Sequence, residues 1–252
     1  MKMEYVEFFV KSKLDGSEQP SLFFAAEGNG RPLIVGLHTW SYERHNQIAK
    51  LLPLAEKLNF NLLLPEFRGP NLDTNPIAHE ACGSELAKAD IIESLDYAIE
   101  NYEVDRNNIF LVGGSGGGHM ALLIAGYAPE RFKAIVSVVP ITDLKKWTEQ
   151  NANCRKHVIA CTGGDEEELM KRSPIFYIDK IAEANLKIFH GKWDKTVPVS
   201  HSLTLYNEIM LRHPEAHVYL DIFDGAHEMC IDQIELFITK QYDREPVDSL
   251  SG

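Results

Sequence analysis

Basic charge is scarce in this sequence. It has 25 lysine and arginine residues against 37 aspartate and glutamate residues, which gives a formal net charge of −12. The basic residues form no cluster anywhere along the chain. Because binding to nucleic-acid phosphates requires clustered cations, we expect no nucleic-acid partner.

Long apolar runs are absent as well. The sequence has no stretch of roughly 18 or more apolar residues, so neither a membrane-spanning helix nor a membrane partner is expected. Residues 1–16 carry acidic side chains within their one apolar stretch and therefore lack the apolar core of a secretory signal. These two absences predict a cytoplasmic protein.

Cysteine is rare, with four residues and no CxxC pair. In a chain of 252 residues without a secretory signal, we expect these cysteines to be free thiols. Cys154 and Cys161 are close enough in sequence to form a disulfide, and that alternative stays open at this point.

Hydrophobic residues make up 44% of the chain, enough for one large domain with a deep core. Short apolar runs rich in branched residues alternate with longer segments of helical period, which is the pattern of an α/β fold. The later runs are typical of parallel strands buried on both faces, and the first two predict an antiparallel hairpin. Extended segments are predicted at Glu4–Val10, Leu22–Ala26, Leu33–Leu37, Asn61–Leu64, Ile109–Gly113, Ala134–Val138, Leu186–His190 and Val218–Phe223.

Helical segments follow most of these strands. Together they predict a mostly parallel, eight-stranded sheet with helices on both faces, in a single domain spanning residues 1–252. From about 142 to 184 the alternation breaks, so a small inserted lid is expected there, and residues 243–252 are expected to be a frayed tail. The predicted helices are Arg44–Lys57, Ala87–Tyr102, Gly116–Tyr127, Asp165–Lys171, Ser200–Arg212 and Met229–Gln241.

The strongest local motif is Gly-Gly-Ser-Gly-Gly at residues 113–117, which fits G-x-S-x-G between a predicted strand and a predicted helix. A nucleophile on such a strained strand-to-helix turn needs glycine neighbours, so Ser115 is predicted to be a nucleophile. The backbone N–H of Gly116 would help to bind an oxyanion. A glycine turn without chemistry, or one that binds an anion, is the alternative. The absence of P-loop and dinucleotide-binding fingerprints weakens that alternative.

A histidine follows in the position expected of a general base. His227 lies in a loop after the last predicted strand and before the last predicted helix. His213 and His217 are predicted at the opposite edge of the sheet, away from Ser115. His38 and His190 end strands, where a buried histidine bonded to backbone is the expected role. The sequence therefore predicts that His227 activates Ser115.

The acid that orients this histidine is predicted to be Asp194, in the turn after the strand Leu186–His190. Its role would be to accept the Nδ1–H of His227. Asp143, after the preceding strand, is the alternative acid, whereas Asp224 is too close in sequence to His227.

A second oxyanion donor is expected from the loop that follows the strand Leu33–Leu37. The backbone N–H of Trp40 is the first choice and that of Thr39 the second. Side chains predicted near the mouth of the pocket are candidates for substrate contacts: Trp40, Glu66, Arg68, Trp147 and Trp193.

Three motifs in this order resemble the catalytic domain of prolyl oligopeptidase-like (peptidase S9-type) hydrolases and related acetyl-xylan-type esterases, which have the α/β-hydrolase fold. They are Gly113–Ala121, the stretch 173–181 beginning Ser-Pro-Ile-Phe-Tyr, and the stretch 190–198, His-Gly-Lys-Trp-Asp-Lys-Thr-Val-Pro. The turn 65–69, Pro-Glu-Phe-Arg-Gly, resembles the Arg-Gly turn of that group, and the similarity covers roughly residues 30–240.

One departure bears on the substrate. Phe67 stands where several relatives have a tyrosine whose hydroxyl helps to bind the oxyanion in peptidases. We therefore predict a serine esterase, similar to acetyl esterases, acting on a small or carbohydrate-linked ester. No metal or organic cofactor is needed. An S9-type serine peptidase acting on short peptides is the alternative, and a non-catalytic binding module on the same fold is the second. The oligomeric state is left open, a homo-oligomer included.

Overall fold

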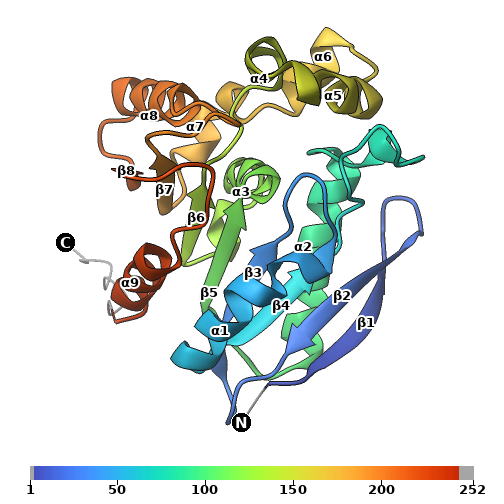
Figure 1. The fold of residues 1–252 in the computed structure, drawn as a ribbon. Coiled ribbons are helices and arrows are strands. Elements are labelled where there is room, and N and C mark those ends of the chain that lie inside the picture. The colour runs from blue at the N-terminus through green and yellow to red at the C-terminus, as the bar shows by residue number, and fades with distance from the viewer. Residues whose placement is uncertain (1–2, 244–252) are drawn as a thin grey trace, which may run out of the picture.

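The computed structural model describes residues 3–243 and contains a central eight-stranded sheet in the order β1-β2-β4-β3-β5-β6-β7-β8 (Figure 1). Except for residue 243, the predicted tail 243–252 lies outside the described residues. No helix between residues 3 and 243 combines the length and apolar character needed to cross a bilayer. The strands are β1 Tyr5–Lys11, β2 Glu18–Phe24, β3 Arg31–Leu37, β4 Asn61–Pro65, β5 Val104–Gly114, β6 Ala134–Val138, β7 Leu186–Gly191 and β8 Val218–Phe223.

The strand pairing confirms the mostly parallel sheet predicted from the sequence. β1 pairs with β2 and β2 with β4 in antiparallel fashion, and all the other neighbours are parallel. Strands β2, β3 and β5 begin earlier than predicted, β2 and β5 by the most residues. β2 begins at Glu18 and β5 at Val104, because ladder pairing extends both strands through polar residues that hide the strand pattern in the sequence.

Helices cover both faces of the sheet, as predicted. On one face, α2 (Glu85–Asn101), α3 (Gly116–Tyr127) and α8 (Ser200–Arg212) bury their apolar residues in one core cluster. On the other face, α1 (Ile48–Leu58) and α9 (Ile231–Tyr242) pack into a second cluster. Short 3-10 helices, η1 to η3, lie at Arg44–Gln47, Ala78–Glu80 and Pro129–Arg131.

The segment expected to be a lid, 142–184, is helical and divides into two parts. In the first part α4, α5 and α6 lie together at one end of the molecule (Figure 1), where Trp147 and Val158 pack with Trp40 in a third core cluster. In the second part Ile178 and Ile181 are buried in the main core with α3. We call the first part, residues 142–173, the cap; the residues that follow it belong to the main core, although the predicted lid extended to 184. The elements of the cap are α4 Leu144–Gln150, η4 Ala152–Cys154, α5 Arg155–Thr162 and α6 Glu166–Lys171, followed by η5 Pro174–Phe176 and α7 Ile178–Ile181. All four cysteines are free thiols, including Cys154 and Cys161.

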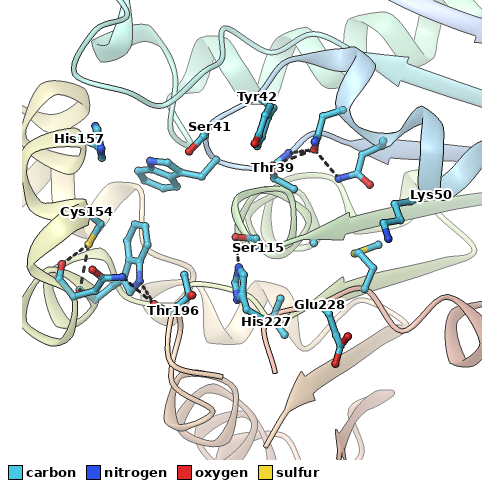
Figure 2. A pocket seen from close by; sticks show the side chains of 18 of the residues that line it. Thr39, Ser41, Tyr42, Lys50, Ser115, Cys154, His157, Thr196, His227 and Glu228 are labelled. Carbon is cyan, nitrogen blue, oxygen red and sulfur yellow. Dashed lines mark hydrogen bonds between the residues drawn. The ribbon is translucent and has the colours of Figure 1, made fainter. Parts of the chain in front are cut away.

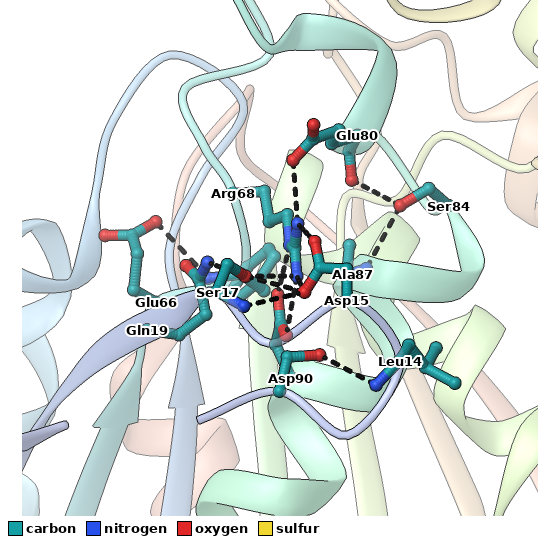
Figure 3. A network of polar contacts seen from close by, with 12 residues as sticks. Leu14, Asp15, Ser17, Gln19, Glu66, Arg68, Glu80, Ser84, Ala87 and Asp90 are labelled. Atoms are coloured by element: carbon teal, nitrogen blue, oxygen red, sulfur yellow. Dashed lines mark hydrogen bonds and ion pairs between the residues drawn. The ribbon is translucent and has the colours of Figure 1, made fainter. Parts of the chain in front are cut away.

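A buried arginine in the loop after β4 contacts three other segments of the chain (Figure 3). The Arg68 side chain is 1% exposed, and its Nε lies 2.7 Å from Asp90 Oδ2 on α2. Its Nη1 lies 2.7 Å from Asp15 in the β1–β2 turn and 2.7 Å from Glu80 in η2. Burial raises the pKa of Asp90 to about 6, although the ion pair with Arg68 opposes this rise. The guanidinium thus stabilises carboxylates that distant parts of the chain bring together.

Replacing this arginine is expected to destabilise the fold strongly. In Arg68→Met the carboxylate of Asp90 stays buried without its cation, so the free energy of unfolding should fall by about 3–5 kcal/mol. Urea denaturation measures the change. Lys57→Ala, which removes an exposed ion pair with Glu235, is the control and should change the midpoint little. Equal midpoints for the two variants would contradict this account of Arg68.

Candidate active site

Ser115 occupies a sharp turn between β5, which ends at Gly114, and α3, which begins at Gly116. Its backbone has φ 55° and ψ −118°, in a region that side-chain-bearing residues rarely adopt. The turn is held because the N–H of Ser115 donates to the carbonyl of Val138 at 2.9 Å. Such strain is typical of functional turns, and here it places the hydroxyl above the edge of the sheet.

The glycines around Ser115 are needed because backbones approach each other closely. A Cβ on Gly113 would lie 2.1 Å from the carbonyl oxygen of Gly117. A Cβ on Gly116 would lie 2.4 Å from the backbone nitrogen of Trp40. The start of α3 therefore packs directly on the loop after β3, as the motif predicts. This packing places the N–H of Gly116 beside that of Trp40.

The structure brings together the three side chains proposed for catalysis. His227, in the loop after β8, has its Nε2 2.8 Å from the Oγ of Ser115 (Figure 2). Its Nδ1 lies 2.6 Å from Oδ2 of Asp194, which follows β7. The other carboxylate oxygen of Asp194 accepts the backbone N–H groups of Thr196 and Val197 at 2.8 and 2.9 Å. The acid is therefore fixed on one side by backbone and faces the histidine on the other.

The environment of Asp194 keeps its carboxylate charged. Burial alone would raise the pKa of this group, but His190, His227 and the backbone N–H of Val197 lower it well below its ordinary range. The two rival acids have other partners. Asp143 caps α4 by accepting the N–H of Lys146, and Asp224 accepts the indole N–H of Trp193. Of the three acids considered from the sequence, Asp194 is the one that contacts His227.

The structure separates the two candidate oxyanion donors in the loop after β3. The N–H of Thr39 donates to Oδ1 of Asn46 at 3.2 Å, so it is occupied. The N–H of Trp40 donates to no protein acceptor within residues 3–243, and the carbonyl of Trp40 accepts the N–H of Asn71 at 2.8 Å. The N–H of Gly116, in the first turn of α3, has no acceptor within the helix. Trp40 and Gly116 thus form the pair of free donors next to Ser115.

A pocket of about 590 Å³ opens beside Ser115 (Figure 2). We call its two sides the aromatic end and the polar end. The aromatic end contains Trp40 and Trp147, whose rings meet edge to face at 4.9 Å, with the cap residues Asn151, Asn153, Cys154 and His157. The polar end contains Asn46, Gln47, Lys50, Glu228 and Met229. Among residues 3–243, no three His, Cys, Asp or Glu side chains gather in a way that could hold a metal ion.

Two of the five predicted substrate contacts, Trp40 and Trp147, line this pocket, and three do not. Arg68 is buried in its carboxylate cluster. Glu66 turns inward, with Oε1 3.0 Å from Nε2 of His38, and it accepts the backbone N–H of Arg44. Trp193 is 59% exposed and donates to Asp224. The structure therefore does not bring these three side chains to the pocket, because each pairs with a group that is distant in the sequence.

Two further histidines near the site, His38 and His190, have structural roles. His38 is buried and stacks on Phe67 with ring centroids 3.7 Å apart. His190 lies behind Asp194, with its Nε2 2.8 Å from the carbonyl of Val197 and its Nδ1 2.7 Å from the Ser202 hydroxyl. Sequence reasoning missed the polar end of the pocket. Asn46, Gln47 and Lys50 could have been found from the predicted helix Arg44–Lys57, because that helix begins at the edge of the sheet where Ser115 lies.

Comparison with known proteins shows the family of this chain. The model of the prolyl oligopeptidase family of S9 peptidases matches residues 84–234. A rice acylamino-acid-releasing enzyme is 28% identical over 251 residues, covering 92% of this chain and 30% of the relative. The chain thus spans less than a third of the length of that relative.

Solved structures show the same fold. An acylaminoacyl peptidase of Pyrococcus horikoshii superposes with a TM-score of 0.74 at 22% identity, covering 98% of this chain and 43% of that one. A fluorophosphonate-binding serine hydrolase of Staphylococcus aureus superposes with a TM-score of 0.76 at 16% identity, covering 97% of this chain and 100% of that one. The family model covers more than half of the sequence, including Ser115, Asp194 and His227. The chain belongs to the prolyl oligopeptidase family.

Proposed function

We propose that this chain is a serine hydrolase that cleaves amide bonds in short peptides, N-acylated peptides among them. The observation that carries the proposal is the continuous hydrogen-bonded chain from Ser115 Oγ to His227 Nε2, at 2.8 Å, and from His227 Nδ1 to Asp194, at 2.6 Å. The names of its relatives, acylamino-acid-releasing enzyme and acylaminoacyl peptidase, favour a peptide substrate over the ester that the sequence suggested.

The reaction would proceed in two acyl-transfer steps. The oxygen of Ser115 attacks the carbonyl carbon while His227 takes its proton, and the imidazolium formed is stabilised by Asp194. The N–H groups of Gly116 and Trp40 hold the negative charge on the tetrahedral oxygen, and each such donor contributes about 2.7–4 kcal/mol. The C–N bond then breaks as His227 gives the proton to the leaving amine. Water repeats the sequence on the acyl-enzyme and releases the acid.

One observation supports an esterase as a second candidate. Phe67 is 1% exposed, stacks on His38 and does not line the pocket. No hydroxyl at this position therefore assists the two backbone donors, so the oxyanion of an amide would receive less stabilisation here. Esters have better leaving groups than amides and need less of this assistance.

A matched pair of substrates separates the two candidates. An N-acetylated amino acid is presented to the enzyme as its nitroanilide and as its nitrophenyl ester, and kcat/KM is measured for each. A peptidase should turn over the anilide with an efficiency near that for the ester. Cleavage of the ester alone would favour the esterase. Labelling by a fluorophosphonate tests both, because a non-catalytic binding module would leave Ser115 unlabelled.

A further inference from the structure

We infer that the polar end of the pocket binds a negatively charged leaving group, so that the preferred substrates are short peptides with a free carboxylate a few atoms beyond the scissile bond. This inference rests on the proposed function and adds the chemistry of the leaving group. It is carried by Gln47, the last residue of η1, and Lys50, in the first turn of α1, which line the pocket and take no part in the acyl-transfer steps.

The two ends of the pocket lie on opposite sides of the nucleophile. Figure 2 shows Cys154 and His157 on one side of Ser115, and Lys50 and Glu228 on the other. The leaving amine must lie within reach of His227 Nε2, which gives it a proton. Glu228 and Met229 directly follow His227 in the chain and line the polar end. The geometry therefore directs the leaving group to the polar end.

The acyl group is directed the opposite way by Trp40. Its backbone N–H is one of the two free donors for the carbonyl oxygen, and its ring belongs to the aromatic end. A carbonyl held by this N–H has its acyl side next to the rings of Trp40 and Trp147, which are 6% and 4% exposed. These two buried aromatic rings can pack against an apolar acyl group, but they provide no ion-pair partner for a charged one.

Lys50 is a cation without a partner at the polar end. Its ammonium forms no ion pair with any side chain within residues 3–243, whereas the chain as a whole carries a net charge of −12. The carboxylate of Glu228 accepts the N–H of Ala226 and points away from Ser115 in Figure 2. Of the described residues at the polar end, Lys50 is therefore the cation that remains available to an anionic ligand.

The position of Lys50 in α1 is unfavourable for the helix itself. The helix runs from Ile48 to Leu58, so Lys50 lies in its first turn, and this turn contains no acidic residue. Cations near a helix N-terminus are destabilised by the helix dipole, whereas anions are stabilised there. An anionic ligand bound to Lys50 would be favoured by the ammonium. Helix stability therefore does not explain a lysine at this position, whereas ligand binding does.

Gln47 supplies a second, independent feature. The residue is 3% exposed and lines the pocket, and its Oε1 has no hydrogen-bond donor within the described chain. Its Nε2 donates to Oδ1 of Asn46 at 3.1 Å, so the amide orientation is fixed. A buried acceptor without a donor is costly, and the N–H of a bound peptide would supply the donor. Gln47 and Lys50 are three residues apart and line the same pocket, so one bound peptide can offer its N–H to the first and its carboxylate to the second.

Two substrates that differ only in one charge test the inference. We would use an N-acetylated tripeptide, phenylalanine followed by two alanines, as the free acid and as the C-terminal carboxamide, with products identified by mass spectrometry. The wild type should cleave the acid with a kcat/KM about fivefold higher than the amide, as expected for one solvent-exposed ion pair. In Lys50→Ala this ratio should fall to about one, and in Lys50→Glu below one. High salt should lower the wild-type ratio as well.

The control is Lys57→Ala, which removes the same charge from the same helix outside the pocket and should keep the wild-type ratio. A ratio that stays at the wild-type value in Lys50→Ala overturns the inference. So does a loss in Lys50→Ala that is confined to peptides whose carboxylate is on the acyl side, as in an N-succinyl group. If the wild type cleaves neither tripeptide and the fluorophosphonate does not label Ser115, both the proposed function and the inference fail. If the tripeptides are cleaved but the ratio of acid to carboxamide is the same in Lys50→Ala as in the wild type, the inference fails and the proposed function stands.

Discussion

Replacing Ser115 by alanine should lower kcat by about 10⁴- to 10⁶-fold on any substrate that the wild type cleaves. The variant keeps the oxyanion donors of Gly116 and Trp40 and the pocket, but it loses the oxygen that attacks the carbonyl. Fluorophosphonate labelling followed by peptide mass spectrometry provides the measurement, together with steady-state kinetics. The label should appear on Ser115 in the wild type and nowhere in the variant.

Ser41 provides an internal control for this experiment. It lines the same pocket but has no hydrogen bond to a histidine within residues 3–243, so its hydroxyl should stay unlabelled in both proteins. The urea midpoint of Ser115→Ala should remain close to that of the wild type, because the exchange removes one partly exposed oxygen. Activity retained by a folded Ser115→Ala would show that another group performs the attack.

The meeting of Ser115, Asp194 and His227 could be predicted because each follows a strand of one parallel sheet. β5, β7 and β8 run in the same direction, so the residues after their carboxyl ends reach the same edge. A strand followed by a turn is visible in the sequence as an apolar run with glycine or a polar residue after it. The alternation of strands and helices, together with the G-x-S-x-G motif, was sufficient to predict all three at this edge, with Asp143 left open as the alternative acid.

The role of Arg68 could not be predicted, because it depends on contacts between segments that are distant in the sequence. Its three carboxylate partners lie 53, 12 and 22 residues away, in a turn, a 3-10 helix and an α-helix. A charged residue in a turn near a predicted mouth has the same local pattern whether it points out or in. Folding turns it inward, where three carboxylates compensate the cost of burying the guanidinium.

The sequence also could not decide between the two backbone donors in the loop after β3, because the decision depends on a tertiary contact. The sequence ranked Trp40 before Thr39 but left both open. The difference arises because Asn46, seven residues on, turns its amide oxygen back to the N–H of Thr39. That contact requires the 3-10 turn of η1, which sequence periodicity merged with the helix that follows. Side chains that accept from a particular backbone N–H are visible only once the loop conformation is known.

Asp194→Asn is expected to lower kcat by about 10⁴-fold while the protein stays folded. The retained amide oxygen can still accept the N–H groups of Thr196 and Val197, so the loop should keep its shape. The new NH₂ group would instead face Nδ1 of His227, where the carboxylate now lies at 2.6 Å. An NH₂ donor selects the tautomer that carries its proton on Nε2. That nitrogen then has no lone pair with which to take the proton of Ser115.

Asp143→Asn is the matched control for this prediction, because it makes the same chemical change in the rival acid. Asparagine caps helices about as well as aspartate, so α4 should keep its capping bond to Lys146 and the cap its position. Its kcat should stay within about twofold of the wild type, since Asp143 makes no contact with His227. If the ranking were reversed, with Asp143→Asn nearly inactive and Asp194→Asn active, the orienting role would pass to Asp143. The hydrogen bond between Asp194 and His227 would then contribute to stability alone.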